Sequence, residues 1–127
     1  VTLSNNASGG FTKALGDQAR GVVVTQVFPS ERSLNYPVIK EAMGLAKAKG
    51  IDELTPAMVE GFINAKVLVE GLRRASPKPD RARMLAALEG MRKFDLGGLE
   101  LSYSATDHSG LAFTDLSIVG SDGRFKR

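Results

Sequence analysis

The chain has 127 residues, of which 43% are hydrophobic and 24% charged, and its net charge is +3 at pH 7. This composition is typical of a globular domain with a hydrophobic core, and it argues against a disordered chain and against a membrane span. Cysteine is absent, which excludes disulfides and thiolate chemistry.

The positive charge is dispersed and mixed with acidic residues. Its densest group surrounds one loop and consists of Arg73, Arg74, Lys78, Arg81 and Arg83. No aromatic residue is interleaved with these side chains, although single-strand binding would favour such residues. We interpret the group as solvated helix ends, and we expect no nucleic-acid partner.

The first quarter of the chain predicts a loop, a helix and a strand. Residues 1–3 resemble the end of a strand, and because the chain begins with Val1 we expect that processing or excision removed a preceding part. Residues 4–10 form a small polar loop, and residues 11–19 a short helix. The β-branched run at 21–28 predicts a strand buried on both faces, as in a parallel or mixed sheet.

The middle of the chain is dominated by a helix predicted over residues 55–75. Thr55 is a suitable N-cap, Pro56 falls at the first helical position, and Ser76–Pro79 prevents continuation. The predicted apolar stripe consists of Met58, Phe62, Ala65, Val69 and Leu72, widened by Val59, Ile63 and Val67. So wide a face must pack against a sheet or other helices.

Further helices are predicted on either side of this one. The first covers residues 37–48, with Gly50 as its C′ residue, and the other runs from an Asp80 N-cap to Arg92. The predicted buried stripe of this second helix consists of Met84, Leu85, Leu88 and Met91.

The last third of the chain predicts strands separated by turns. In order, these are a Gly97-Gly98 turn, a strand at 99–103, a polar turn at 105–110, a strand at 113–119, a turn at 121–123 and a basic tail at 124–127. Helices and strands alternate along the whole chain, so the predicted class is α/β.

No catalytic constellation is evident. His108 is the only histidine and stands between Asp107 and Ser109, but neighbours in one turn do not converge on a substrate as a catalytic triad does. One histidine without cysteine does not build the usual zinc sites. We therefore expect no enzyme activity, no metal and no cofactor.

A small-ligand contact is conceivable at the entry to the first helix. Exposed N–H groups there, with Ser4, Asn5, Asn6 and Ser8 nearby, are suited to a small anionic or zwitterionic ligand. The same residues are also common turn formers, which is the alternative interpretation.

The order of these features resembles that of a known family. The matching stretches are residues 10–25 (GFTKALGDQARGVVVT), 60–75 (EGFINAKVLVEGLRRA), 85–89 (LAALE), 95–102 and 115–125 (DLSIVGSDGRF). They are similar to the C-terminal portion of type I periplasmic solute-binding proteins of ABC importers, the leucine/isoleucine/valine-binding family. The likeness depends on order and spacing across nearly the whole chain.

The resemblance implies part of a two-lobed α/β fold, with a mostly parallel sheet flanked by helices and ligand enclosed between the lobes. By that likeness, residues 1–30 belong to the second lobe, 31–104 to the first, and 105–127 return to the second. The segments at 28–30 and 102–104 would then be hinge strands.

The resemblance also implies ligand-binding positions. Ser4, Asn5, Asn6, Ala7 and Ser8 occupy a second-lobe contact region, and Met58 lies near an apolar contact, although its alternative role is in the core. Branched-chain binders place an acid in that loop to receive the ligand's ammonium. This loop has none, so an aromatic or other carboxylic acid is as plausible as an amino acid.

The implied function is an extracytoplasmic (periplasmic) receptor that closes on a small amino acid or carboxylic acid and delivers it to an ABC-transporter permease. The alternative is a ligand-sensing domain of the same fold in a membrane receptor or transcription regulator. If residues 1–127 are all that is present, we expect weak ligand binding. We also expect exposed apolar surface that associates with a second copy or with the missing N-terminal part.

Overall fold

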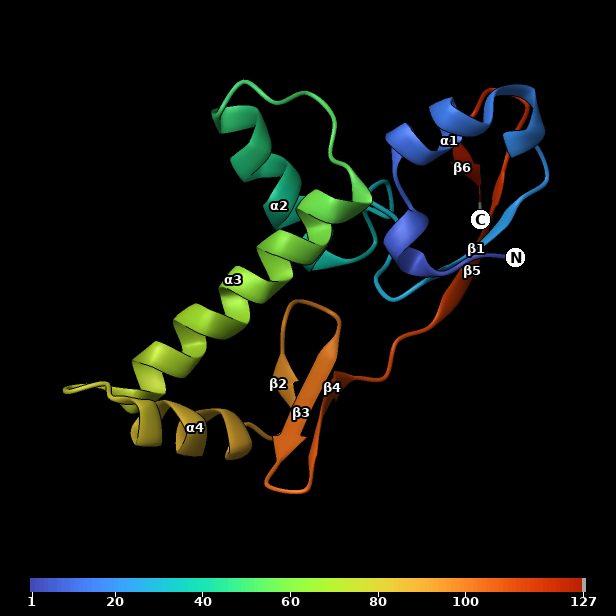
Figure 1. The fold of residues 1–127 in the computed structure, drawn as a ribbon. Coiled ribbons are helices and arrows are strands. Elements are labelled where there is room, and N and C mark those ends of the chain that lie inside the picture. Colours follow the sequence, from blue (N-terminus) through green and yellow to red (C-terminus); the bar gives the residue numbers. More distant parts are fainter. Residues whose placement is uncertain (127) are drawn as a thin grey trace.

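The computed structural model describes residues 1–126 and places its elements in two groups (Figure 1). The elements are η1 (Ser4–Asn6), α1 (Gly9–Leu15), η2 (Gly16–Ala19), β1 (Val23–Gln26), α2 (Pro37–Ala48), α3 (Pro56–Ala75), α4 (Arg81–Glu89), β2 (Phe94–Asp95), β3 (Glu100–Ser104), β4 (Asp107–Leu111), β5 (Asp115–Val119) and β6 (Phe125–Lys126). The first and last parts of the chain form one group, and the middle forms the other. The α/β class is confirmed.

The smaller group is built on a sheet of order β1-β5-β6. β1 pairs antiparallel with β5, from Val23 opposite Ile118 to Gln26 opposite Asp115. The short helices α1 and η2 lie beside this sheet (Figure 1). Their common core consists of Ala7, Ala19, Val24 and Val119, with Leu15, Val22 and Phe125 around it.

The larger group packs α3 against α2 and α4, and α3 shares a core with the sheet of order β2-β3-β4. Its buried core consists of Val38, Ile39, Val59, Ile63, Val67, Met91, Leu96, Leu99 and Leu101. The predicted long helix is confirmed in both bounds and cap, because the Thr55 side chain accepts a hydrogen bond from the Met58 N–H at 3.2 Å. The Asp80 cap of α4 is also confirmed, at 2.8 Å from the Arg83 nitrogen.

The buried face of α3 differs from the predicted stripe. Val59, Ile63 and Val67 are its buried centre, together with Gly71 and Ala75. Met58, Val69 and Leu72 are exposed, although they were expected at the middle of the stripe. The helix has apolar residues around more than half of its circumference, so periodicity alone did not single out the side that meets the sheet.

Several other expectations need correction. Residues 107–111 form strand β4 and not a polar turn, because the Ser104 hydroxyl accepts the Asp107 N–H at 2.9 Å and closes a tight hairpin with β3. α4 ends at Glu89, and Leu85 on it is exposed. The short strands β2 and β6 were missed, and Arg127 of the predicted tail lies outside the described residues.

The expected mostly parallel sheet is also corrected within the described chain. Each strand ladder is antiparallel, and the parallel pairing is an isolated bridge between Thr2 and Val24. β1 was expected to be buried on both faces, but Val23 and Thr25 are half-buried. The physical reason is that β1 meets β5 along one side and little more than Thr2 along the other.

The chain crosses between the two groups at two places. The first crossing follows β1, where Phe28 already packs against the larger core. The second differs from the expected hinge at 102–104, because Ser102 pairs with Gly110 inside the β3–β4 hairpin. Phe113 still packs on the larger core, in edge-to-face contact with Tyr36 at 6.3 Å. Residues 112–114 therefore carry the chain back to β5.

We predict that Gly97→Ala destabilises the larger group. Gly97 has φ of 108°, and an added Cβ would lie 2.8 Å from the backbone nitrogen of Val38. The expected loss is about 2 kcal/mol or more in the free energy of unfolding, measured in urea. The control is Gly44→Ala in α2, where an added Cβ meets nothing within 4 Å, and it should gain about 0.5–1 kcal/mol. Equal stability of the two variants would contradict this packing.

A second prediction concerns Glu70 on α3. Its carboxylate accepts hydrogen bonds from Arg73 Nε at 2.8 Å and Arg74 Nε at 2.6 Å, which lowers the pKa of Glu70 from 4.5 to about 2. Because the pKa falls on folding, the stabilisation is present above pH 4.5 and is lost as the pH falls toward 2. Glu70→Gln should cost about 1 kcal/mol at neutral pH.

The measurement is the free energy of unfolding of Glu70→Gln and of wild type as a function of pH. The two curves should converge near the folded-state pKa. Glu53→Gln is the matched control, because exposed Glu53 has no ion pair with a described residue. A gap between the curves that stays constant with pH would refute the ion-pair origin.

Candidate functional site

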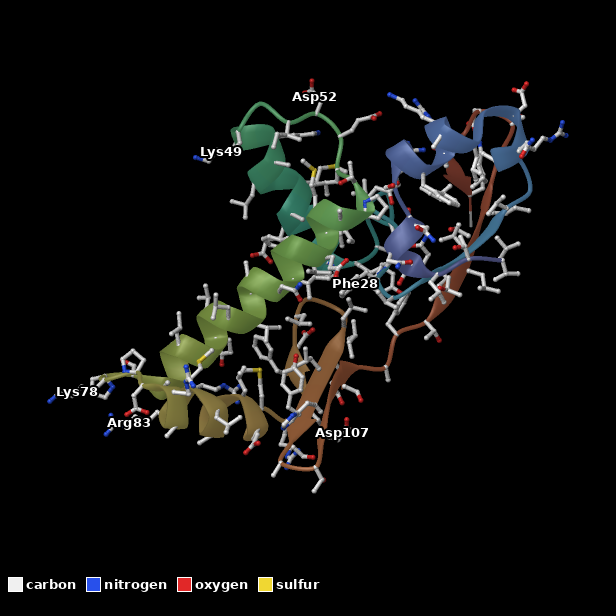
Figure 2. The ribbon with its side chains drawn as sticks, in the orientation of Figure 1. Phe28, Lys49, Asp52, Lys78, Arg83 and Asp107 are labelled. Carbon is white, nitrogen blue, oxygen red and sulfur yellow. The ribbon has the colours of Figure 1, made fainter. Side chains whose placement is uncertain are left out.

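A small cavity lies where the two groups meet. It has a volume of about 90 Å³, well below the roughly 300 Å³ or more of typical small-molecule pockets. Its wall consists of Ser4, Asn5, Ala7, Ser8, Gln26, Val27, Phe28, Pro29, Pro56, Ala57 and Glu60. The wall thus combines the loop before α1, the end of β1 and the first turns of α3. In Figure 2, Phe28 lies at this junction, whereas Lys78 and Arg83 lie at the far end of the molecule.

The loop wall is held by its own hydrogen bonds. The Ala7 N–H donates to the Ser4 carbonyl at 2.9 Å, which forms the turn η1. The Ser8 side chain caps α1 by accepting the Phe11 N–H at 3.2 Å. Ser8 therefore serves as both a turn former and a part of the cavity wall, and the two interpretations made from the sequence are compatible.

Gln26 is a wall residue that sequence reasoning missed. It is 4% exposed, and its Nε2 donates to the Ser117 hydroxyl at 2.8 Å, while that hydroxyl donates to the Val24 carbonyl at 3.3 Å. β5 thus fixes the orientation of a polar side chain at the end of β1. The available signal was a glutamine at the end of a strand rich in β-branched residues.

The first turns of α3 supply the opposite wall through Pro56, Ala57 and Glu60. The packing of Val59 in the larger core holds this end of the helix in place. Glu60 is exposed and lines the cavity from an element far in sequence from the loop. The sequence did not indicate that Glu60 and the loop would line the same cavity, because they are more than fifty positions apart in the chain.

The predicted ligand-binding residues are only partly brought together. Ser4, Asn5, Ala7 and Ser8 line the cavity. Asn6 points elsewhere and donates to the Thr2 hydroxyl at 2.7 Å. Met58 is 39% exposed and is not part of the wall, although its neighbours Pro56 and Ala57 are. The expectation that Met58 belongs to the core is also not met.

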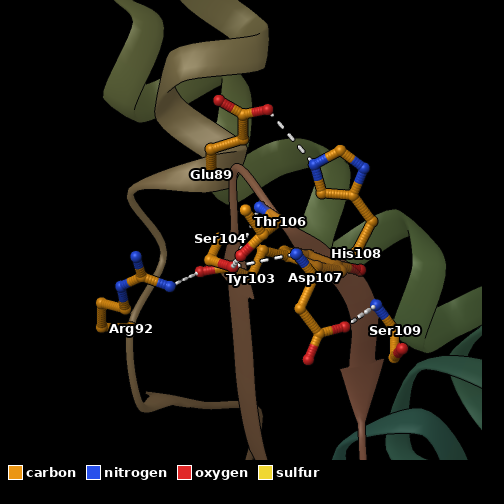
Figure 3. Close-up of polar contacts among 8 residues, drawn as sticks. All are labelled: Glu89, Arg92, Tyr103, Ser104, Thr106, Asp107, His108 and Ser109. Atoms are coloured by element: carbon orange, nitrogen blue, oxygen red, sulfur yellow. Dashed lines mark hydrogen bonds and ion pairs between the residues drawn. The ribbon is translucent and has the colours of Figure 1, made fainter.

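His108, Ser109 and Asp107 do not form a catalytic arrangement (Figure 3). The Asp107 carboxylate accepts the Ser109 backbone N–H at 2.9 Å, which lowers the pKa of Asp107. His108 Nε2 instead lies 3.2 Å from Glu89 on α4. The His108–Glu89 contact joins the hairpin to α4, whereas the Asp107–Ser109 hydrogen bond stays within β4.

Residues 1–126 contain no group of three or more histidine, cysteine, aspartate or glutamate side chains placed to hold a metal ion. Within the same residues, none of the helices has the length and apolar character needed to cross a membrane.

We predict that Ser117→Ala destabilises the protein, because it removes the hydrogen-bond partner of Gln26 in the cavity wall. Removing the hydroxyl takes away the acceptor of a buried amide, which should cost about 1–3 kcal/mol in the free energy of unfolding. The measurement is urea denaturation, with Ser121→Ala in the exposed turn after β5 as the control, expected within about 0.5 kcal/mol of wild type. A loss no greater than that of the control would contradict the described network.

Two α/β cores joined by two crossing segments, with a small, mostly apolar cavity at their junction, make up the described fold. A model of the periplasmic binding protein family matches residues 3–123 of the chain. The chain therefore belongs to the periplasmic binding protein family. A search of curated proteins gave no significant match.

Solved structures share the fold over nearly the whole chain. A substrate-binding periplasmic protein from Ralstonia solanacearum is 35% identical, with a TM-score of 0.81, over 97% of this chain and 36% of that one. An extracellular ligand-binding receptor from Verminephrobacter eiseniae is 28% identical, with a TM-score of 0.81, over 98% of this chain and 36% of that one. A possible leucine/isoleucine/valine-binding protein from Rhodopirellula baltica is 28% identical, with a TM-score of 0.80, over 98% of this chain and 34% of that one. This chain thus spans about a third of the length of these proteins.

Proposed function

We propose that this chain forms part of an extracytoplasmic solute receptor, which binds a small carboxylic acid or amino acid between two lobes and delivers it to an ABC importer. The observation that carries the proposal is the cavity at the junction of the two cores, with one wall from each. Family membership supports a solute-binding role, since the family consists of solute-binding proteins. The similarity to a possible leucine/isoleucine/valine-binding protein from Rhodopirellula baltica supports an amino-acid ligand.

The proposed mechanism is hinge closure. The two cores share no buried residue, and the chain passes between them after β1 and at residues 112–114. Rotation about two such segments would bring the Ser4–Ser8 loop toward the start of α3 and exclude water from the ligand. We assign the group containing β1, β5 and β6 to the second lobe and the group containing α2–α4 to the first.

The proposed partners follow from this role. The ligand is a small organic acid, and the protein partner is the membrane permease of an ABC transporter. The proposed location is the periplasm, as the family description suggests. The lobes need no chemical step for this function, because the free energy of ligand binding drives closure.

The test is a thermal-shift screen of amino acids and aromatic acids on the natural polypeptide that carries residues 1–127. A ligand at about 100 times its Kd should add roughly 2.7 kcal/mol, which raises the Tm by several degrees. Ala57→Trp should abolish the shift, because Ala57 lines the cavity. Ala65→Trp, on an exposed part of the same helix, is the control and should keep it. No shift with any acid, or an equal effect of the two variants, would contradict the proposal.

A further inference from the structure

We propose that the buried pair Gln26 and Ser117 selects acids that carry a hydroxyl group away from their carboxylate. In this assignment Gln26 contacts the ligand, and Ser117 is a positioning residue that acts through Gln26. The inference rests on the proposed function, because it names a chemical feature of the acid that the same cavity binds. The selection operates through one neutral hydrogen bond and requires no charge on the protein.

Gln26 is the buried polar side chain of the cavity wall. It is 4% exposed, whereas the wall residues Asn5, Ser8 and Glu60 are exposed and Ser4 is half-buried. A hydrogen bond at an exposed side chain is readily replaced by one to water. At a buried side chain the same loss leaves a polar group unpaired, which costs far more binding free energy. Gln26 is therefore the wall residue best placed to discriminate between ligands.

The orientation of the Gln26 amide is fixed by Ser117 on β5. Ser117 is 2% exposed and lies outside the cavity wall. Its hydroxyl has a single proton, which it donates to the Val24 carbonyl at 3.3 Å. The hydroxyl is therefore an acceptor toward Gln26, and Nε2 of the amide donates to it at 2.8 Å. The amide nitrogen thus faces β5, and the carbonyl oxygen Oε1 lies at the free end of the amide.

Oε1 is the part of Gln26 that is left for the cavity. Among the described residues, each buried side-chain nitrogen or oxygen atom has a hydrogen-bond partner. The side-chain hydrogen bond that Gln26 makes to another described residue uses Nε2. Oε1 is therefore accessible to solvent, and the cavity is the pocket that this otherwise buried residue lines. The wall presents a neutral hydrogen-bond acceptor there.

A neutral acceptor in a mostly apolar wall requires a particular ligand group. An ionised carboxylate has no proton to donate, so the carboxylate of the ligand faces away from Gln26. A hydroxyl donates one proton and is buried beside the uncharged amide without the desolvation cost of an ion. A ligand with a methyl group in its place would exclude water from Oε1 without pairing it. The amide therefore discriminates between hydroxyl and methyl groups of nearly equal size.

The experiment uses two pairs of acids in which a hydroxyl replaces a methyl group. One pair is 4-hydroxybenzoate and 4-methylbenzoate, and the other is threonine and valine. Binding is measured by calorimetry on the natural polypeptide that carries residues 1–127. The proteins are wild type, Gln26→Met, Ser117→Ala, Ser117→Thr and, as control, Ser121→Ala in the exposed turn after β5. The readout is the ratio of the two Kd values within a pair, which does not depend on the fraction of folded protein.

Wild type should bind the hydroxyl member of one pair roughly 5- to 100-fold more tightly than the methyl member, the range for an unpaired buried acceptor. Gln26→Met, which keeps the length of the side chain, should bring this ratio close to one. Ser117→Ala should lower it by about threefold or more, because the amide is then free to turn. Ser117→Thr keeps the hydroxyl and should retain the preference, and Ser121→Ala should match wild type.

The remaining outcomes separate this inference from the proposed function. Binding of either pair without preference for the hydroxyl member overturns the inference, while the receptor function stands. A preference that survives Gln26→Met overturns the role of Gln26, and one that is lost there but survives Ser117→Ala overturns the positioning role of Ser117. If none of the four acids binds, the inference is overturned. The receptor function then stands if another acid raises the Tm in the thermal-shift screen, and falls with the inference if none does.

Discussion

The packing of α3 on the β2–β3–β4 sheet is the constraint on which the rest of the larger group depends. Val59, Ile63 and Val67 bury one side of the helix against Leu96, Leu99 and Leu101. Because Val59 lies in the first turns, this same packing fixes the direction in which Pro56, Ala57 and Glu60 face. The helix therefore determines the core of one group and one wall of the cavity between the groups.

The antiparallel β1–β5 pairing has the corresponding role in the smaller group. It joins residues near the two ends of the chain, and through Ser117 it holds the Gln26 amide at the junction. The two cores are otherwise separate, and the crossings after β1 and at residues 112–114 connect them. A cavity lined from both sides at such a junction changes shape when the cores rotate, which is the physical basis of ligand-driven closure.

Apolar side chains are exposed on the outer side of α3. Leu68, Val69 and Leu72 are exposed, and Leu72 contributes with Leu85 and Leu88 to a wide hollow between α3 and α4. Association through this surface stays a prediction.

Local chemistry in the sequence determined the helices, their caps at Thr55 and Asp80, the β1 and β5 runs and the α/β class, because each depends on neighbouring residues. The sequence also indicated Ser4–Ser8 as a candidate contact region, and most of these residues line the cavity. Only the tertiary structure decided which side of α3 is buried, that residues 107–111 form a strand, and that Glu60 and Gln26 line the same cavity as the loop. These features depend on contacts between residues far apart in the chain, and no local pattern of spacing or composition encodes such contacts.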